Sequence, residues 1–386
     1  MKPLALYIHV PFCARKCAYC DFASWPGREG EWRRYFDALV TEIRLWSENT
    51  DFGLLKERFR VRSAFVGGGT PTLVRAEWIA EALELCRKIA PFDADAEITV
   101  EGNPGTLTPE KLRTYRQAGV NRLSMGAQSF DDGLLHDLGR IHTAGQIVEA
   151  VEMARDAGFS NINLDLMYGL PGQTMGQWLD TLKQAVALGV PHISAYSLIL
   201  EPGTPLYERV ARGEVTVPDD EAVIAMQRAA AELLSKSDFG RYEISNYARP
   251  KSESCHNLTY WYRGDYLGLG CAAHSMLDET RFSNPDSLDE YLARRRMTDV
   301  QRLNRWDIIE ETVMLNTRAT KGIDLAAWER RFGRPFAPED DKALERLTGA
   351  GYIEIADGRL YLTGRGLEVQ NAVVLELLEI QEAMER

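Results

Sequence analysis

Three cysteines follow a predicted strand in the segment Leu4-Ala-Leu-Tyr-Ile-His-Val-Pro-Phe-Cys13-Ala-Arg-Lys-Cys17-Ala-Tyr-Cys20. Three thiolates on so short a loop can wrap one compact metal centre. A zinc site with His9 as its fourth ligand is the alternative, but zinc ligands usually come as two separated pairs. The segment therefore predicts a [4Fe–4S] cluster, in which three cysteine ligands leave one iron open for another molecule.

The alternation of a strand with a following helix recurs along the chain. Apolar, β-rich runs predict strands at Leu4–Val10, Ser63–Gly67, Glu97–Glu101, Asn121–Gln128, Asn161–Tyr168 and His192–Leu198. Apolar residues at three- and four-residue spacing predict helices at Glu31–Trp46, Ala76–Ile89, Pro109–Ala118, Ala144–Ala157, Met175–Leu188 and Asp220–Leu234. Since about eight βα units are needed to close a full barrel, we expect an α/β fold with an open, partial (β/α)6 barrel of the TIM type. A doubly wound parallel sheet is the alternative.

The pattern changes beyond Leu303, where helices are followed by a predicted hairpin over residues 351–363 that turns at Asp357-Gly358. This combination predicts a small winged-helix-like α+β domain. We therefore expect a barrel over residues 1–240, a connecting segment over 241–302 and a C-terminal domain over 303–386. The helix at 342–348 and the hairpin mix acidic with basic residues, which favours a packing or partner role over DNA binding.

Composition excludes several classes of protein. The formal charge of -12 over 386 residues gives no basic footprint for nucleic acid. No apolar run approaches the roughly 20 residues of a membrane span, so we expect no membrane insertion. The opening residues are too short for a secretory signal, which predicts the reducing cytoplasm. Cys86, Cys255 and Cys271 are scattered, and we expect them to be structural.

Polar and glycine-rich motifs follow the predicted strands at the carboxyl ends, where a barrel gathers its ligand-binding loops. A Gly67-Gly-Gly-Thr-Pro-Thr72 turn follows the second strand, and the missing side chains would let backbone N–H groups approach a ligand. Glu101, Gln128 and Asp165 end the next three strands. An internal salt bridge would explain either carboxylate alone, but the convergence on one face predicts ligand binding. Arg140 offers a planar fork for a ligand carboxylate.

These motifs together resemble the radical-SAM superfamily, because Cys-x3-Cys-x2-Cys follows the first strand and GGGTPT follows the second. The longer set, with Gly126-Ala-Gln-Ser129, Leu138-Gly-Arg140, Asp165-Leu-Met-Tyr-Gly-Leu-Pro171 and Glu201-Pro-Gly-Thr-Pro205, is similar to the oxygen-independent coproporphyrinogen III oxidase branch. The resemblance implies a cluster on Cys13, Cys17 and Cys20 and a site for S-adenosylmethionine (SAM). The SAM-binding residues that it implies are Tyr7, Gly68, Gly69, Thr70, Glu101, Gln128, Arg140 and Asp165, and His274 is a further candidate.

This branch contains porphyrinogen-decarboxylating oxidases and heme chaperones, and three features favour the chaperones. Phe22 stands where the oxidases have a fourth cysteine. Only twelve residues precede Cys13, whereas the oxidases carry an N-terminal extension over the substrate. The stretch His256-Asn-Leu-Thr-Tyr-Trp261 matches the HNxxYW motif of the chaperones, which makes His256 a candidate heme ligand. An ordinary hydrogen-bonded histidine is the alternative for His256.

The resemblance thus implies a heme chaperone that holds heme and delivers it to apo-hemoproteins, among them membrane-bound respiratory enzymes. It also implies a homodimer whose formation is controlled by SAM or by the cluster, and it leaves open whether SAM is cleaved. The alternative is an oxygen-independent oxidase that converts coproporphyrinogen III to protoporphyrinogen IX by radical SAM chemistry.

Overall fold

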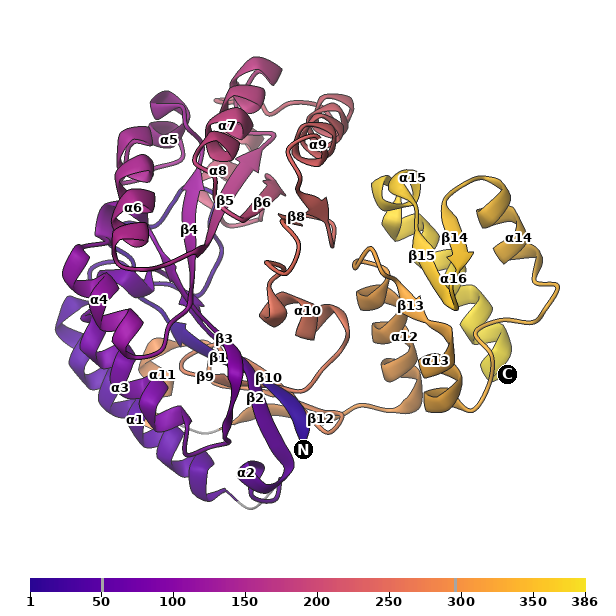
Figure 1. Ribbon diagram of the computed structural model, residues 1–386, viewed down its shortest axis with the longest axis horizontal. Helices are drawn as coiled ribbons and strands as arrows, with labels where there is room; N and C mark the ends of the chain where they lie inside the picture. The colour runs from indigo at the N-terminus through magenta and orange to yellow at the C-terminus, as the bar shows by residue number, and fades with distance from the viewer. Residues whose placement is uncertain (50–51, 295–296) are drawn as a thin grey trace.

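The computed structural model describes residues 1–49, 52–294 and 297–386 (Figure 1). Its main body alternates strands and helices as the sequence predicts. The central strands are β1 (Lys2–Val10), β2 (Phe59–Gly68), β3 (Phe92–Gly102), β4 (Arg122–Gln128), β5 (Asn161–Tyr168) and β6 (His192–Ser197). The helices that follow them are α1 (Trp32–Glu48), α3 (Ala76–Cys86), α4 (Pro109–Gln117), α6 (Ala144–Asp156), α7 (Met175–Ala187) and α9 (Asp220–Ser235).

Strands β1 to β6 lie side by side in chain order, and each is parallel to the next. A doubly wound sheet would reverse its strand order partway, so this topology excludes it. The long helices cover the outer face of the curved sheet (Figure 1). The predicted α/β fold with a partial (β/α)6 barrel is therefore confirmed.

Burial and capping explain why these segments take these structures. Along β1, every residue from Leu4 to Val10 except Tyr7 is buried, as expected for a parallel strand that is covered on both faces. Helices α6 and α7 each begin with a capping box, formed by Thr143 with Gln146 and by Thr174 with Gln177. These reciprocal bonds satisfy backbone N–H groups that the first turn of a helix leaves free.

Shorter strands extend both edges of the sheet. At one edge, β8 (Asn246–Ala248) pairs antiparallel with β6, and β7 (Gly240–Arg241) pairs with β8. At the other edge, β9 (Tyr266–Leu269) runs parallel to β1 and is followed outward by β10 (His274–Leu277), β11 (Thr280–Ser283) and β12 (Thr298–Arg302). Residues 241–302, which the sequence marks only as a connection, thus supply strands to both edges.

Several short helices sit between these strands. They are α2 (Leu55–Arg58), α5 (Asp132–Asp137), α8 (Pro205–Ala211), α10 (Cys255–Trp261) and α11 (Leu288–Arg294), together with single 3₁₀ turns at Glu29–Glu31, Pro71–Leu73 and Pro104–Thr106. Helix α10 carries the HNxxYW motif and lies between the sheet and the C-terminal helices (Figure 1).

The C-terminal part has its own core, built from α12 (Arg305–Asn316), α13 (Leu325–Phe332), α14 (Lys342–Gly349), α15 (Gly364–Glu368) and α16 (Gln370–Glu385) around a small antiparallel sheet. The sheet contains β13 (Ile323–Asp324), β14 (Ile353–Ala356) and β15 (Arg359–Leu362). The predicted hairpin is confirmed, since β14 and β15 pair across Asp357 and Gly358, whose φ angles of 50° and 72° suit a type I′ turn.

Candidate functional site

A cavity of about 340 Å³ opens at the carboxyl ends of β1 to β6. Its walls come from the loops and strand ends that follow one another around the partial barrel, as the topology requires. Among the residues that line it are ten of the predicted site residues: Cys13, Cys17, Cys20, Gly68, Gly69, Thr70, Glu101, Gln128, Arg140 and Asp165. The expected convergence of these side chains on one site is therefore what the structure shows.

The cysteine loop is held in place by contacts on both sides. The Ala18 N–H donates to the Leu138 carbonyl at 3.1 Å, and the Ala18 carbonyl accepts from the Leu206 N–H at 2.8 Å. Arg140 Nη1 lies 3.4 Å from Cys17 Sγ, and Thr70 Oγ1 lies 3.7 Å from Cys13 Sγ. A guanidinium and a hydroxyl thus lie beside two of the three sulfurs.

The cysteines do not form a site for a single metal ion. Within residues 1–49, 52–294 and 297–386, no three His, Cys, Asp or Glu side chains are grouped as such a site. His9 is not available as a fourth ligand, because its Nδ1 lies 2.9 Å from the Tyr7 hydroxyl and its Nε2 lies 2.8 Å from the Ala23 carbonyl. Since each cysteine of a [4Fe–4S] cluster binds a different iron, its sulfurs need to surround a cavity rather than meet at a point. The donor set fits a cluster better than zinc.

The glycines after β2 are needed for close packing. Gly68 has a φ of +113°, and a Cβ there would lie 2.5 Å from the His9 ring. A Cβ on Gly69 would lie 2.6 Å from the Phe12 carbonyl oxygen. The N–H groups from Gly68 to Thr70 donate within the protein, to Glu101, Val10 and Phe12 respectively. The expectation that these N–H groups face a ligand is therefore wrong: the glycines allow the two loops to approach each other.

Two carboxylates stand on the same wall of the cavity. Glu101 accepts a hydrogen bond from the Gly68 N–H at 3.1 Å. The pKa of Glu101 is raised to about 8, mainly because the carboxyl is buried and to a lesser extent because Asp165 is close. Asp165 accepts from Ser124 Oγ at 3.1 Å and from Asn163 Nδ2 at 2.9 Å. Asp165 is thus fixed by two neutral donors, whereas no cationic side chain in the described part of the chain is paired with Glu101 to hold it ionised. A cationic ligand in the cavity would supply that partner.

Gln128 and Arg140 also line the cavity, and both are held at the end of β4, the strand between those of Glu101 and Asp165. Gln128 has a φ of 65°, a conformation that costs a non-glycine residue about 1 kcal/mol or more and that often marks a functional position. Arg140 Nη2 donates to the Gly126 carbonyl at 2.6 Å, but its buried Nε has no partner among the described residues. An unpaired N–H beside a cavity indicates an acceptor that belongs to a bound molecule.

Two predicted residues do not line this cavity. The Tyr7 hydroxyl is bonded to His9, and its ring packs 6.3 Å from that of Phe65, behind the cavity wall. His274 begins β10 on the extended edge of the sheet, where it is exposed. The sequence places Tyr7 late in the first strand and His274 after the glycines of residues 268–270, but it gives no direction for either side chain.

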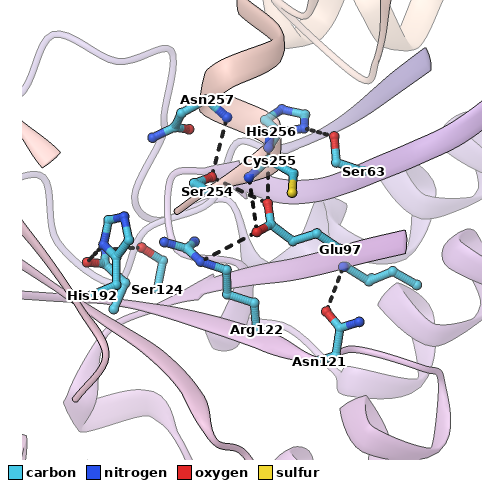
Figure 2. Close-up of polar contacts among 12 residues, drawn as sticks. Ser63, Glu97, Asn121, Arg122, Ser124, His192, Ser254, Cys255, His256 and Asn257 are labelled. Carbon is cyan, nitrogen blue, oxygen red and sulfur yellow. Dashed lines mark hydrogen bonds and ion pairs between the residues drawn. The ribbon is translucent and has the colours of Figure 1, made fainter. Parts of the chain in front are cut away.

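His256 lies elsewhere, at the start of α10 on the inner side of the sheet (Figure 2). Its Nδ1 is 3.0 Å from Ser63 Oγ, its Nε2 is 3.0 Å from the Tyr260 hydroxyl, and its ring stacks on Phe65 at 5.0 Å. Burial lowers its pKa to about 3, so the ring is neutral at pH 7. Both nitrogens are therefore engaged within the protein.

Glu97 holds the helix that carries His256 (Figure 2). Its carboxylate accepts from the N–H groups of Cys255 at 3.2 Å and His256 at 3.1 Å, and from Ser254 Oγ at 3.4 Å. Arg122 Nε lies 3.9 Å from the same carboxylate, and both side chains are buried. A carboxylate at a helix N-terminus is favoured by the free N–H groups and the helix dipole.

Other residues of the cavity were not predicted from the sequence. They include Phe22, Ser124, Ile141, Met167 and Tyr196. Ser124, Met167 and Tyr196 lie on strands and face inward at alternate positions, so the two-residue period of the strands could have identified them. Phe22 is 63% exposed and Ile141 44% exposed, which gives the mouth of the cavity an apolar rim.

Comparisons with known proteins show the family to which this chain belongs. The model of the Radical SAM superfamily matches residues 7–185, and that of the HemN C-terminal domain matches residues 303–369. The chain is 35% identical over 373 residues to the heme chaperone HemW of Bacillus subtilis, which covers 95% of this chain and 97% of that protein. It is 40% identical over 276 residues to the heme chaperone HemW of Escherichia coli, with 71% of this chain and 70% of that protein covered.

A solved structure is similar over nearly the whole chain. The radical SAM enzyme coproporphyrinogen III oxidase (HemN) from Escherichia coli superposes with a TM-score of 0.82 at 25% identity, covering 97% of this chain and 90% of that one.

In the part of this chain that the structure describes, no helix is long and apolar enough to cross a membrane.

Proposed function

Since this chain belongs to the heme chaperone HemW family of the radical SAM superfamily, we propose that it binds a [4Fe–4S] cluster, SAM and heme and delivers the heme to apo-hemoproteins. The observation that carries the cluster and SAM proposal is the cavity itself. Three cysteines, two carboxylates, an amide and an arginine with an unpaired N–H line one space at the carboxyl ends of the strands.

Cys13, Cys17 and Cys20 would hold the cluster. When bound, it supplies an open iron that can take up the amino and carboxylate groups of SAM and an electron for radical chemistry. Arg140 lies against Cys17 and has a free Nε, so it would orient an anionic group close to the cluster. Thr70 beside Cys13 would stabilise that thiolate through its hydroxyl.

The carboxylates would hold the cationic part of SAM. Glu101 and Asp165 both line the cavity, and a positively charged ligand there would favour the ionised form of Glu101. Gln128 offers an amide that can donate and accept hydrogen bonds to a ribose or an adenine. Tyr7 would act from behind the wall, because its hydroxyl orients His9, whose ring fills the space above Gly68.

The heme proposal rests on membership of the heme chaperone family and on two sequence features, Phe22 after the cysteine loop and the HNxxYW motif. Phe22 lines the cavity where the oxidases have a fourth cysteine, and α10 carries the HNxxYW motif. His256 remains the candidate iron ligand, but it can reach heme only after the bond between its Nε2 and Tyr260 breaks. We propose membrane-bound respiratory enzymes as the proteins that receive the heme. We also propose that the chain delivers it as a homodimer whose formation is controlled by SAM or by the cluster.

An anaerobic reconstitution tests the proposal. We expect about four iron and four sulfide per chain with broad visible absorption, followed by stoichiometric heme uptake and transfer to an apo-hemoprotein such as apomyoglobin. A colourless preparation that contains zinc would overturn the cluster, and a chain that takes up no heme would overturn the chaperone function. Similarity to the oxidase supports a second candidate, turnover of coproporphyrinogen III, which the same preparation can be assayed for.

A further inference from the structure

A second cavity of about 340 Å³ lies where the turn after α10 meets the C-terminal helices α12 and α13. Tyr262 and Arg263 form its wall on the side of α10, and Thr312, Asn316, Trp328 and Phe332 belong to the opposite side. It shares no lining residue with the cysteine cavity. The HNxxYW helix thus ends at a hollow that the SAM site does not use.

Arg263 enters this cavity with part of its guanidinium unpaired. Its side chain is 2% exposed, its Nη1 donates to Glu279 at 2.5 Å, and its Nε donates to Glu311 at 2.8 Å. Its buried Nη2 has no hydrogen-bond partner among the described residues. A buried donor left without an acceptor is destabilising, so its place at a cavity wall points to an acceptor on a ligand.

Trp328 supplies a second unpaired donor. The residue is 2% exposed on α13, and its ring packs 4.3 Å from that of Phe332. The indole Nε1 is buried, and within the described ranges it too lacks a partner. Indole N–H and guanidinium N–H groups can only donate. Two such groups on residues that line one cavity favour a ligand with oxygen acceptors.

The backbone conformation at Arg263 is one that arginine rarely adopts, which indicates that the position needs the guanidinium and not only a turn. Arg263 has a φ of 55° just beyond α10, and Gly264 follows it. A glycine would adopt that left-handed conformation with no steric cost, whereas an arginine is strained in it. The turn itself would be made more easily by another residue.

The charges around the cavity favour an anion. Glu279 is shared by Arg263 and Arg331, and Glu311 is shared by Arg263 and Arg281. Three arginines therefore face two glutamates, and the exposed Arg330 lies on the same wall. The one acidic residue among those lining the cavity, Asp324, is paired with Arg359.

We propose that this cavity binds carboxylate groups of a flat, apolar ligand through Arg263 and Trp328. Resting on the proposed function, the ligand is heme, and the groups bound are its propionates. Tyr262 is 38% exposed and, with Phe332, supplies aromatic surface beside these donors for the edge of the macrocycle. Heme would then lie at the end of the helix that carries the HNxxYW motif.

The test compares protoporphyrin IX with its dimethyl ester, which differ only in their carboxylates, and includes heme as the proposed ligand. Iron-free protoporphyrin IX, its dimethyl ester and heme are titrated into the full-length protein, the Trp328→Phe variant and the control Trp306→Phe. Trp306 also packs on the C-terminal core but does not line the cavity. We expect Trp328→Phe to weaken binding of the free acid about tenfold, since it loses one hydrogen bond to a charged group, and Trp306→Phe to leave it unchanged. The ester should bind more weakly than the acid and equally to all three proteins.

If Trp328→Phe folds poorly, the comparison of acid and ester on the wild-type protein still tests the proposal. The exposed Arg330→Gln change is a second, milder variant. Equal binding of acid and ester, or an unchanged affinity in Trp328→Phe, would overturn the cavity as a propionate site and leave heme transport standing. A wild-type protein that binds neither heme nor protoporphyrin IX contradicts both proposals. Preference for the acid without heme transfer to an apoprotein contradicts the chaperone function alone.

Discussion

Arg140 joins the two halves of the candidate site, because it contacts Cys17 through one Nη and the end of β4 through the other. Its free Nε and its position between the cysteine loop and the strand ends would let it link the proposed cluster to the proposed SAM site. Single residues around this arginine can therefore be tested separately for cluster and SAM binding.

Replacement of one cluster ligand should abolish the cluster but not the fold. We expect Cys17→Ala to lose the iron, the sulfide and the broad visible absorption after anaerobic reconstitution, because the remaining two cysteines cannot hold the cluster. Cys255→Ala is the matched control, since Cys255 lies outside the cavity. Retention of a full complement of iron by Cys17→Ala would contradict the assignment.

The affinity for SAM should depend on pH through Glu101. The pKa of this carboxyl is raised to about 8, so it is mostly protonated at pH 7. SAM has a cationic sulfonium, which favours the ionised carboxylate, so binding releases a proton and the affinity should rise severalfold as the pH increases to about 8. Equilibrium dialysis across this range measures it. The same rise in Glu101→Gln would mean that another group titrates.

The role of His256 can be tested through its partner. The Tyr260→Phe change removes the hydroxyl that contacts His256 Nε2. If His256 binds the heme iron, this nitrogen is then free to do so, and we expect severalfold tighter heme binding. His256→Ala should then weaken heme binding and shift the heme absorption bands. Identical bands in wild type and His256→Ala would show that another residue binds the iron.

The convergence of residues on the cysteine cavity could be predicted from the sequence because parallel strands end at one edge. Glu101 and Gln128 lie at the ends of β3 and β4, and Asp165 lies within β5, on strands whose boundaries are marked by the turns that follow. The burial of His256 could not be predicted, since it depends on Ser63 and Phe65, far away in the sequence. The unpaired donors of Arg263 and Trp328 likewise exist only once distant segments have packed.

Helix α10 is the element that connects the barrel to the C-terminal domain. Glu97 and Ser254 hold its N-terminus, and at its other end the Trp261 carbonyl accepts from Asn316 of α12 at 2.8 Å. A helix this short has little stability of its own, so its geometry depends on these contacts.

Loss of the Glu97 carboxylate should therefore destabilise the protein. We expect Glu97→Gln to lower the free energy of unfolding by about 2–3 kcal/mol, because it leaves the Arg122 charge buried without a partner. Denaturant unfolding measures the change, and the exposed Glu84→Gln should be neutral. The double change Glu97→Gln with Arg122→Met should recover part of the loss, and no recovery would argue against the buried ion pair as its cause.

The main elements were predictable and the edge strands were not, for a physical reason. The six parallel strands are apolar runs long enough to stand out, as β5 from Asn161 to Tyr168 shows. Strands such as β8 and β9 contain only three and four residues, and their pairing depends on the edges of a sheet that is already formed. A short run of this kind has no detectable period.

At the scale of the whole molecule, two cavities divide the proposed functions. The cysteine cavity sits within the barrel, and the arginine-lined cavity sits at the junction with the C-terminal domain. The bidentate pair of Arg228 on α9 with Glu368 on α15, at 2.7 Å, is a further link between the two parts. This division would let heme bind without entering the SAM site, as a carrier requires.

The central claim is that this chain carries heme instead of oxidising porphyrinogen. One anaerobically reconstituted sample, supplied with SAM and reductant, should be divided between a heme-transfer assay and a coproporphyrinogen III assay. We predict stoichiometric heme uptake and transfer to an apo-hemoprotein, with no protoporphyrinogen IX formed. Catalytic formation of protoporphyrinogen IX without heme transfer would contradict the account.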